Sequence, residues 1–195
     1  MPLIDPDRVV TPLRAVRLSA AHRKRLPSWI DAVVEEQDRW LVLGQGPEHA
    51  DRDPEGYTHE LGLTSVDDLL EAAARSEQAP LGAVLLRKTR PPRLLAVVHE
   101  LERNPTLDGS AVSQALETIL RLTARTSMRA IALPVIGNHD DAVEVEDFGE
   151  RLADALSMAG PARLRIALMA DFAVVRRVAR ILREACPGVH VGLAR

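Results

Sequence analysis

The tetrapeptide Gly137-Asn138-His139-Asp140 combines residue types that hold phosphate groups and metal ions in proteins. It follows an apolar run, residues 130–136, and precedes a segment with helical spacing. A glycine at the end of a strand lets the backbone approach a phosphate closely, and the N–H groups that open a helix attract anions. Imidazole and carboxylate groups are instead ligands of divalent cations. This segment therefore predicts either a phosphate loop or a metal site.

A polar segment nearer the N-terminus carries the same residue types. Residues 48–62, EHADRDPEGYTHELG, form a long predicted loop, and such loops in compact domains are usually functional or mobile. If the two loops meet, their imidazole and carboxylate groups could hold one divalent cation. The metal-ligand candidates are His49, His139, Asp140 and Asp141. The alternative is two solvated acidic loops, with Asp140 or Asp141 only capping the helix that follows.

The sequence Gly-Asn-His-Asp after a strand also resembles one metal-binding block of the calcineurin-like metallophosphoesterases. Such an enzyme holds two cations, which bind both the attacking and the leaving oxygen. It therefore needs further ligands, including an Asp-x-His on the first strand. The first expected strand, residues 12–20, contains no acid, and no later Gly-Asp or Gly-His-x-His block follows. One block without its structural context does not predict this activity.

The composition limits the class of protein. The 195 residues are 46% hydrophobic and 27% charged, with a formal net charge of −3, so there is no basic excess to attract nucleic acid. No apolar run approaches the roughly 18 residues that span a bilayer, and no signal-peptide pattern is present. The single Cys186 cannot form an internal disulfide and is expected to be unreactive. We expect a cytoplasmic protein with a flexible arm at residues 1–11 and one domain at residues 12–195, without nucleic-acid or membrane partners.

Secondary-structure elements alternate along the chain. Apolar spacing in the first half predicts a strand at residues 12–20, a short helix at 26–37, a buried strand at 39–47 and a helix at 64–77. In the second half it predicts two strands separated by the turn at Pro91-Pro92, then helices at 110–127, 145–158 and 171–185 alternating with strands at 129–137, 163–170 and 188–194. Strands buried on both faces and joined by helices indicate an α/β fold, a three-layer α/β/α sandwich with a mixed, mostly parallel sheet.

Ligands of such sheets bind at the carboxyl ends of the strands, where two glycine-bearing loops are expected. One follows the strand at 39–47 and the other follows the strand at 129–137. The candidate binding residues are Gly44, Gln45, Gly46, Val135, Ile136, Gly137, Asn138 and His139.

Two stretches of the second half resemble the macro-domain family. Residues 82–101, GAVLLRKTRPPRLLAVVHEL, have the family's Gly-x-Ala/Val block, its Pro-containing turn and a strand ending in a histidine, here His99. Residues 127–141, SMRAIALPVIGNHDD, resemble the family's Ser-Ile-Ala-Phe-Pro-x-Ile strand and the phosphate loop after it. The order of these motifs matches over about residues 81–185. Earlier in the chain, only the expected strand at 39–47 falls in place of the family's Val-Asn-Ala-Ala-Asn block.

The resemblance implies a macro-like domain that binds ADP-ribose or a related nucleotide derivative, with the pyrophosphate on backbone N–H groups of the two loops. Three departures modify this expectation. Ser19 or Ala20 stands where the family has an adenine-binding Asp. VLGQGP lacks the hydrolytic asparagines, which implies a non-catalytic module. GNHDD replaces the Gly-Thr-Gly loop, and its two acids imply a bridging cation, a different ligand or a lost pocket.

Three functions therefore stay open. The first is a nucleotide-binding module. The second is a protein-interaction or scaffold domain with a degenerate pocket, for which leucine and arginine on the helix at 171–185 could form a partner surface, although amphipathic packing also explains that helix. The third is a metal-dependent hydrolase that uses the two His/Asp loops. His99 is expected to be a hydrogen-bonded core histidine and not a ligand-binding group.

Overall fold

The structure, a computed structural model, describes residues 14–22, 25–39, 79–99, 109–126, 128–137, 144–159 and 161–194. The arm predicted at residues 1–11, the helix expected at 64–77 and most of the strand expected at 39–47 lie outside these ranges. Within them, no helix is long and apolar enough to cross a membrane.

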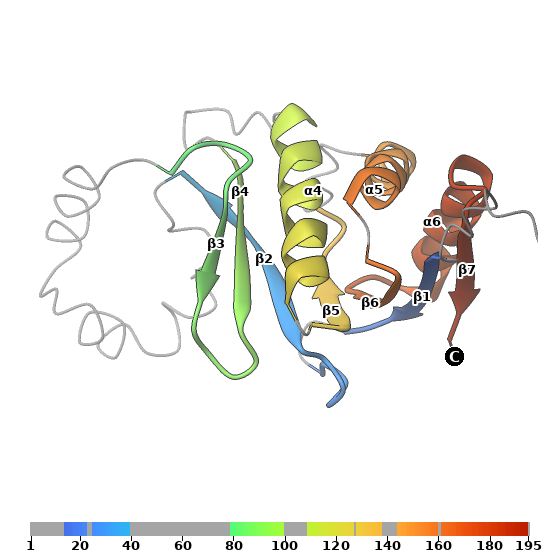
Figure 1. The fold of residues 1–195 in the computed structure, drawn as a ribbon, viewed down its shortest axis with the longest axis horizontal. Helices are drawn as coiled ribbons and strands as arrows, with labels where there is room; N and C mark the ends of the chain where they lie inside the picture. The colour runs from blue at the N-terminus through green and yellow to red at the C-terminus, as the bar shows by residue number, and fades with distance from the viewer. Residues whose placement is uncertain are drawn as a thin grey trace, which may run out of the picture.

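The described residues form one seven-stranded sheet (Figure 1). Its strands are β1 (Arg14–Ala20), β2 (Ala32–Asp38), β3 (Val84–Arg87), β4 (Arg93–His99), β5 (Ala130–Leu133), β6 (Arg163–Leu168) and β7 (Val189–Leu193). Across the sheet their order is β3-β4-β2-β5-β6-β1-β7. Every neighbouring pair is parallel except the hairpin β3–β4. The mixed, mostly parallel sheet predicted from the sequence is confirmed.

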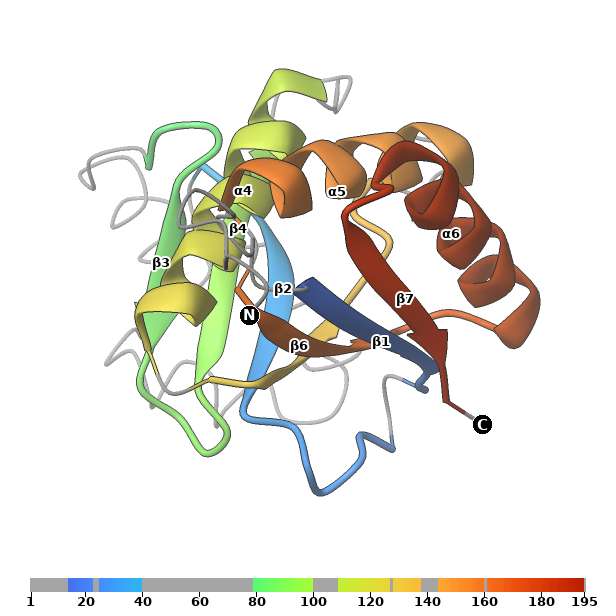
Figure 2. The same ribbon diagram turned by 45° about the vertical axis from the view of Figure 1, so that its right-hand side comes forward.

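Helices on one face of the sheet connect its later strands. They are α4 (Gly109–Arg125), α5 (Val145–Ala159) and α6 (Phe172–Ala185). The connections through them all advance in the same direction across the sheet, and right-handed crossovers of that kind place their helices on one face. Figures 1 and 2 show the three helices side by side on that face. The α/β fold is thus confirmed. The other helical layer of the predicted sandwich depends on residues outside the described ranges.

The hydrophobic core lies between this helical layer and the sheet. Alternate strand residues point into it: Val16 and Leu18 of β1 are buried, while Arg17 between them is exposed. The residues at helical spacing on one face of α4 and of α5 are buried. They are Val112, Ala115, Leu116, Ile119 and Thr123 of α4, and Val145, Phe148, Leu152, Ala155 and Leu156 of α5.

The starts of α5 and α6 show which residues stand at their N-cap positions. Asp171 caps α6, because its Oδ1 accepts a hydrogen bond from the backbone nitrogen of Val174 at 2.9 Å. Helix α5 begins at Val145, so the N-cap position falls on Glu144. The expectation that Asp140 or Asp141 caps this helix is therefore wrong.

The prediction of a helix at residues 26–37 is also wrong, because the second half of this segment belongs to the central strand β2, Ala32–Asp38. Val33 and Val34 are consecutive residues, and both are buried. A strand in the middle of a covered sheet buries successive residues in this way, and β-branched side chains favour it. The apolar spacing in this segment fitted a helix and a doubly buried strand equally well.

The connection that leads into β2 is anchored to neighbouring strands. The Asp31 carboxylate accepts hydrogen bonds from the backbone nitrogens of Arg129 and Ala130, at 2.7 and 2.9 Å. The Trp29 ring lies under the Arg165 guanidinium of β6, 3.9 Å from the ring centroid, an arrangement that attracts the cation to the ring face. These contacts fix the start of β2 beside β5 and so determine where its carboxyl end lies.

Candidate functional site

The centre of the sheet's carboxyl edge brings together the ends of β2, β4 and β5. Glu36 lies near the end of β2, His99 is the last residue of β4, and Gly137 follows β5. The three strands are parallel neighbours, so their carboxyl ends meet at one edge, where α/β sheets bind ligands. One carboxylate oxygen, Glu36 Oε2, lies 2.8 Å from His99 Nε2 and 3.1 Å from the backbone nitrogen of Gly137. Three segments thus converge on one oxygen.

Gly137 has a backbone conformation that favours glycine. Its φ of 85° lies in the left-handed region, where a Cβ atom is strained. The two residues before it, Val135 and Ile136, are buried, with exposed fractions of 8% and 0%. Their side chains belong to the core, so only their backbone could contact a ligand. The loop therefore offers main-chain groups at this edge.

The structure describes only part of the predicted site. Val135, Ile136 and Gly137 lie at the carboxyl edge, and their role in binding stays a prediction. The remaining candidates fall outside the described residues, and their roles also stay predictions: Gly44, Gln45, Gly46, Asn138, His139, His49, Asp140 and Asp141. Within the described residues, no group of three or more His, Cys, Asp or Glu side chains could hold a metal ion.

His99 contacts Glu36 at a point where the pairing of β2 with β4 is irregular. The register is regular up to the pair Gln37 and Val97, after which Asp38 lies opposite His99 and one residue of β4 is skipped. Such a bulge redirects the side chains that follow it. Both partners are mostly buried, with side-chain exposed fractions of 17% for His99 and 18% for Glu36. An ionised carboxylate can only accept a hydrogen bond, so His99 Nε2 donates to it.

The Glu36 carboxylate is an oxyanion bound to a backbone N–H at the end of a strand. A hydrogen bond to a charged group contributes about 1.5–3 kcal/mol, so two donors hold the side chain firmly. A second anion about 4 Å away would be repelled by roughly 4 kcal/mol at an effective dielectric constant of about 20. Glu36 therefore shows that the Gly137 N–H can bind an oxyanion, and it also competes for that donor.

Two side-chain oxygens in the described part of the chain are buried near this edge without a hydrogen-bond partner. They are Ser19 Oγ of β1 and Gln37 Oε1 of β2. Gln37 is only 3% exposed. A buried acceptor without a donor costs about 1–3 kcal/mol, and a ligand hydroxyl or amino group could supply that donor. Ser19 is also one of the residues expected at the adenine-binding position.

Sequence reasoning missed Glu36 and Gln37 because it assigned both to the last turn of a helix at residues 26–37, and not to the carboxyl end of a strand. One signal could have identified them. The apolar run at 32–34 is followed directly by the polar residues 35–38, as in a short buried strand that ends at a ligand edge.

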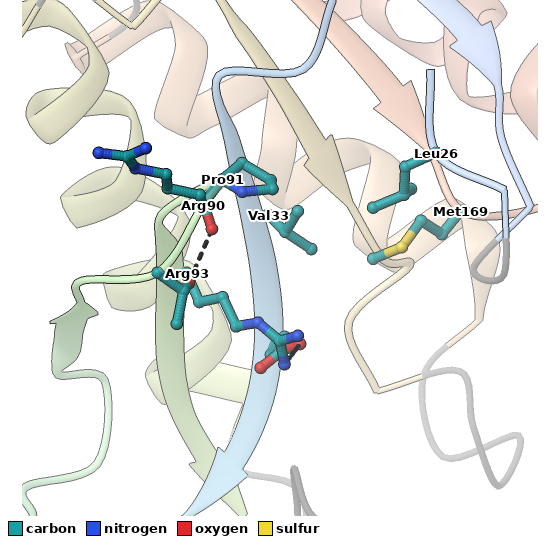
Figure 3. A pocket seen from close by; sticks show the side chains of 8 residues that line it. Leu26, Val33, Arg90, Pro91, Arg93 and Met169 are labelled. Atoms are coloured by element: carbon teal, nitrogen blue, oxygen red, sulfur yellow. Dashed lines mark hydrogen bonds and ion pairs between the residues drawn. The ribbon is translucent and has the colours of Figure 1, made fainter. Parts of the chain in front are cut away.

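A cavity of about 170 Å³ lies on the face of the sheet opposite the described helices (Figure 3). Figure 3 shows Leu26 and Met169 on one side of it, with Arg90, Pro91 and Arg93 on the other. Its lining residues are Leu26, Val33, Glu35, Thr89, Arg90, Pro91, Arg93 and Met169.

This cavity is separate from the part of the sheet's carboxyl edge where Gly137 lies. At its wall, Arg93 Nη1 donates a hydrogen bond to Glu35 Oε1 at 2.7 Å. Glu35 and Glu36 are consecutive residues of a strand and point to opposite faces. The two carboxylates of β2 therefore have different surroundings, and only Glu36 lies beside Gly137.

The sequence also led to expectations about Cys186 and about the leucine of α6. Cys186 is buried, with its Sγ donating to the carbonyl oxygen of Ala153 at 3.2 Å, in agreement with the unreactive thiol predicted. The expectation of exposed leucine on α6 is wrong, because Leu182 is fully buried. The apolar side of this helix packs into the core, which agrees with the simpler interpretation.

No protein-family model matches the sequence, and no curated protein matches it either. Solved structures with a similar fold do exist. The chain is similar to the macrodomain of Thermus aquaticus DarG, with 15% identity and a TM-score of 0.55 over 80% of this chain and 98% of that chain. It is also similar to the macrodomain of Mycobacterium tuberculosis DarG, with 16% identity and a TM-score of 0.56 over 79% of this chain and 98% of that chain. A third similar structure is an Oceanobacillus iheyensis macrodomain variant with ADPR, with 13% identity and a TM-score of 0.52 over 87% of this chain and 90% of that chain. The chain therefore has a macro-domain fold, which confirms the resemblance found over residues 81–185.

Proposed function

We propose that this chain is a non-catalytic module that binds ADP-ribose or a related nucleotide derivative at the carboxyl edge of its sheet. The observation that carries the proposal is the hydrogen bond from the Gly137 N–H to the Glu36 carboxylate, at 3.1 Å. It is an oxyanion held by a backbone donor of a glycine with positive φ. A diphosphate offers the same kind of acceptor, and backbone donors after strands commonly bind phosphates.

The solved neighbours support this class of ligand. The Oceanobacillus iheyensis macrodomain variant, which has a TM-score of 0.52 to this chain, was solved with ADPR. The unpartnered acceptors Ser19 Oγ and Gln37 Oε1 add support, because ribose hydroxyls and the adenine amino group are donors. Gln37 points to the face of the sheet opposite Glu36, so a ligand that meets both Gly137 and Gln37 would have to extend over the carboxyl edge.

The residues of β2 support binding without hydrolysis. The resemblance sets the family's Val-Asn-Ala-Ala-Asn block at residues 39–47, while a correspondence with the preceding strand β2 would set it at residues 34–38, Val-Glu-Glu-Gln-Asp. Neither segment contains an asparagine. The asparagines that the resemblance assigns to hydrolysis are therefore missing under either correspondence.

Calorimetric titration with ADP-ribose tests the proposal. EDTA-treated protein and protein with added Mg²⁺ are compared, because acids near the predicted phosphate loop would favour a bridging cation. We expect saturable binding, weakened at least about tenfold, or about 1.4 kcal/mol, by Gly137→Ala, which forces a Cβ onto a left-handed residue.

The matched control is Gly82→Ala. Gly82 has a φ of 79°, close to that of Gly137, but lies beside β3 at one side of the sheet. A Cβ at Gly82 also meets the Gln114 side chain, 2.3 Å from its Oε1, so this variant is at least as strained as Gly137→Ala. Once shown to be folded, it should retain ADP-ribose binding. If folded wild-type protein shows no binding heat with or without Mg²⁺, nucleotide binding is wrong and a protein-interaction domain becomes the better account.

A further inference from the structure

We propose that Glu36 is the residue that determines which ligands this site accepts, because its carboxylate occupies the donor that a phosphate oxygen would use. This inference rests on the proposed nucleotide site and names a specificity determinant within it. A ligand that brings phosphate to Gly137 has to displace Glu36 and then bind beside its negative charge. Ligands without a negative charge at that point meet no such opposition.

The first support is that Glu36 is held in place by two different segments. His99 Nε2 comes from a residue 63 positions away and the Gly137 N–H from one 101 positions away, and both lie within hydrogen-bond distance of Oε2. The side chain is mostly buried, at 18% exposure, so it cannot leave this position without losing both bonds. The carboxylate is therefore a fixed part of the edge.

The second support is that few positively charged groups of the described residues lie near the Glu36 carboxylate to offset its negative charge. In the described part of the chain, the ionisable group that contacts Glu36 is His99. Arg93, on β4 like His99, bonds to Glu35 on the opposite face of the sheet and is thus unavailable to Glu36. An approaching phosphate would meet a carboxylate that no described arginine neutralises, in a mostly buried position where charges repel strongly.

Substitution by glutamine isolates the effect of the charge. The side chain of Glu36→Gln has the same shape and keeps an amide oxygen that can accept from Gly137, but its bond to that donor is weaker and its repulsion of phosphate is gone. We expect Glu36→Gln to bind ADP-ribose about tenfold more tightly than wild type, a value that allows for solvent screening at a partly exposed group. Adenosine, which has no phosphate, should bind the two proteins equally.

The chain provides a matched control in Glu35→Gln. It removes the same charge one residue away, on the same strand, from a carboxylate that faces the opposite side of the sheet and bonds to Arg93. Net charge changes equally in the two variants, so a general electrostatic effect would appear in both. We expect Glu35→Gln to leave the affinity for ADP-ribose at the wild-type value.

Calorimetric titrations of the three proteins with ADP-ribose, adenosine and inorganic pyrophosphate give a decision in every case, once circular dichroism has shown each to be folded. Tighter binding of ADP-ribose and pyrophosphate by Glu36→Gln alone supports the inference. Equal affinity in wild type and Glu36→Gln, or an equal gain in Glu35→Gln, overturns it and leaves nucleotide binding intact. If ADP-ribose binds to none of them but pyrophosphate binds Glu36→Gln more tightly, the nucleotide proposal is wrong while the role of Glu36 stands. Absence of all binding overturns both.

Discussion

Glu36 and Gly137 are 101 residues apart in the sequence, yet a carboxylate oxygen of Glu36 lies 3.1 Å from the backbone nitrogen of Gly137. The contact exists because β2 and β5 are parallel neighbours and the loop after β5 passes the end of β2. It joins an acidic side chain to the glycine predicted to bind phosphate. An oxyanion of the chain itself therefore already occupies the Gly137 N–H at this edge.

Replacing His99 by alanine removes one of the two donors that hold Glu36. A hydrogen bond to a charged group contributes about 1.5–3 kcal/mol, and Glu36 can partly compensate by turning towards solvent, so we expect the free energy of unfolding to fall by about 1–2 kcal/mol. Urea denaturation measures the change. The control is His190→Ala, which removes an exposed histidine of β7 and should change the free energy by less than about 0.5 kcal/mol. Equal effects of the two variants would mean that the bond to Glu36 contributes nothing.

The two phenylalanines of the chain offer a test of the core. Phe148 of α5 is 0% exposed, whereas Phe172 at the start of α6 is 46% exposed. We expect Phe148→Ala to lower the free energy of unfolding by about 3–5 kcal/mol through lost burial and a residual cavity. The same substitution at Phe172 should cost less than about 1 kcal/mol. Chemical denaturation of both variants checks this, and similar losses would contradict the burial of Phe148 in the core.

The ion pair between α5 and α6 predicts a measurable titration. Arg177 Nε lies 3.0 Å from Glu146 Oε1 and Nη2 lies 2.6 Å from Oε2, and this hydrogen-bonded guanidinium lowers the pKa of Glu146. A lowered pKa in the folded state means that the pair stabilises the protein above the ordinary pKa of a glutamate. That stabilisation is lost as the pH falls through the lowered value. Because the pair is exposed, its effect on stability is small.

Carboxyl NMR titration measures that shift directly. We expect Arg177→Gln to return the pKa of Glu146 towards its ordinary value. The control Arg176→Gln removes a neighbouring exposed arginine that has no part in the pair, and should leave the pKa of Glu146 low. An unchanged pKa in Arg177→Gln would show that the ion pair does not persist in solution.

The second half of the fold could be predicted because its signals are local. Helices α4 and α5 repeat their apolar residues at helical spacing over about four turns, and the residues at that spacing are buried. Asp171 precedes its helix with the residue type that caps best. The two strands on either side of Pro91-Pro92 followed from their apolar runs, and the structure pairs them as the antiparallel hairpin of β3 and β4.

The centre of the site could not be predicted, since it depends on long-range pairing. A run of three apolar residues at 32–34 fits a helix as well as a doubly buried strand, and only the position of β2 between β4 and β5 decides between them. The irregular register beside His99 depends on that same pairing. Glu36 therefore looked like one of several solvated acids, and its contact with Gly137, a residue that the sequence had singled out, could not be foreseen.

The most direct test of the central claim is the backbone amide signal of Gly137 in a ¹⁵N-edited NMR titration with ADP-ribose. If the ligand binds at this edge and displaces Glu36, the Gly137 signal shifts and saturates with ligand concentration, and it does so at lower concentration in Glu36→Gln. Amides of the exposed side of α6 should remain unchanged in the same spectra. A folded protein whose Gly137 signal does not move in either variant, while ligand is present in large excess, would contradict the account.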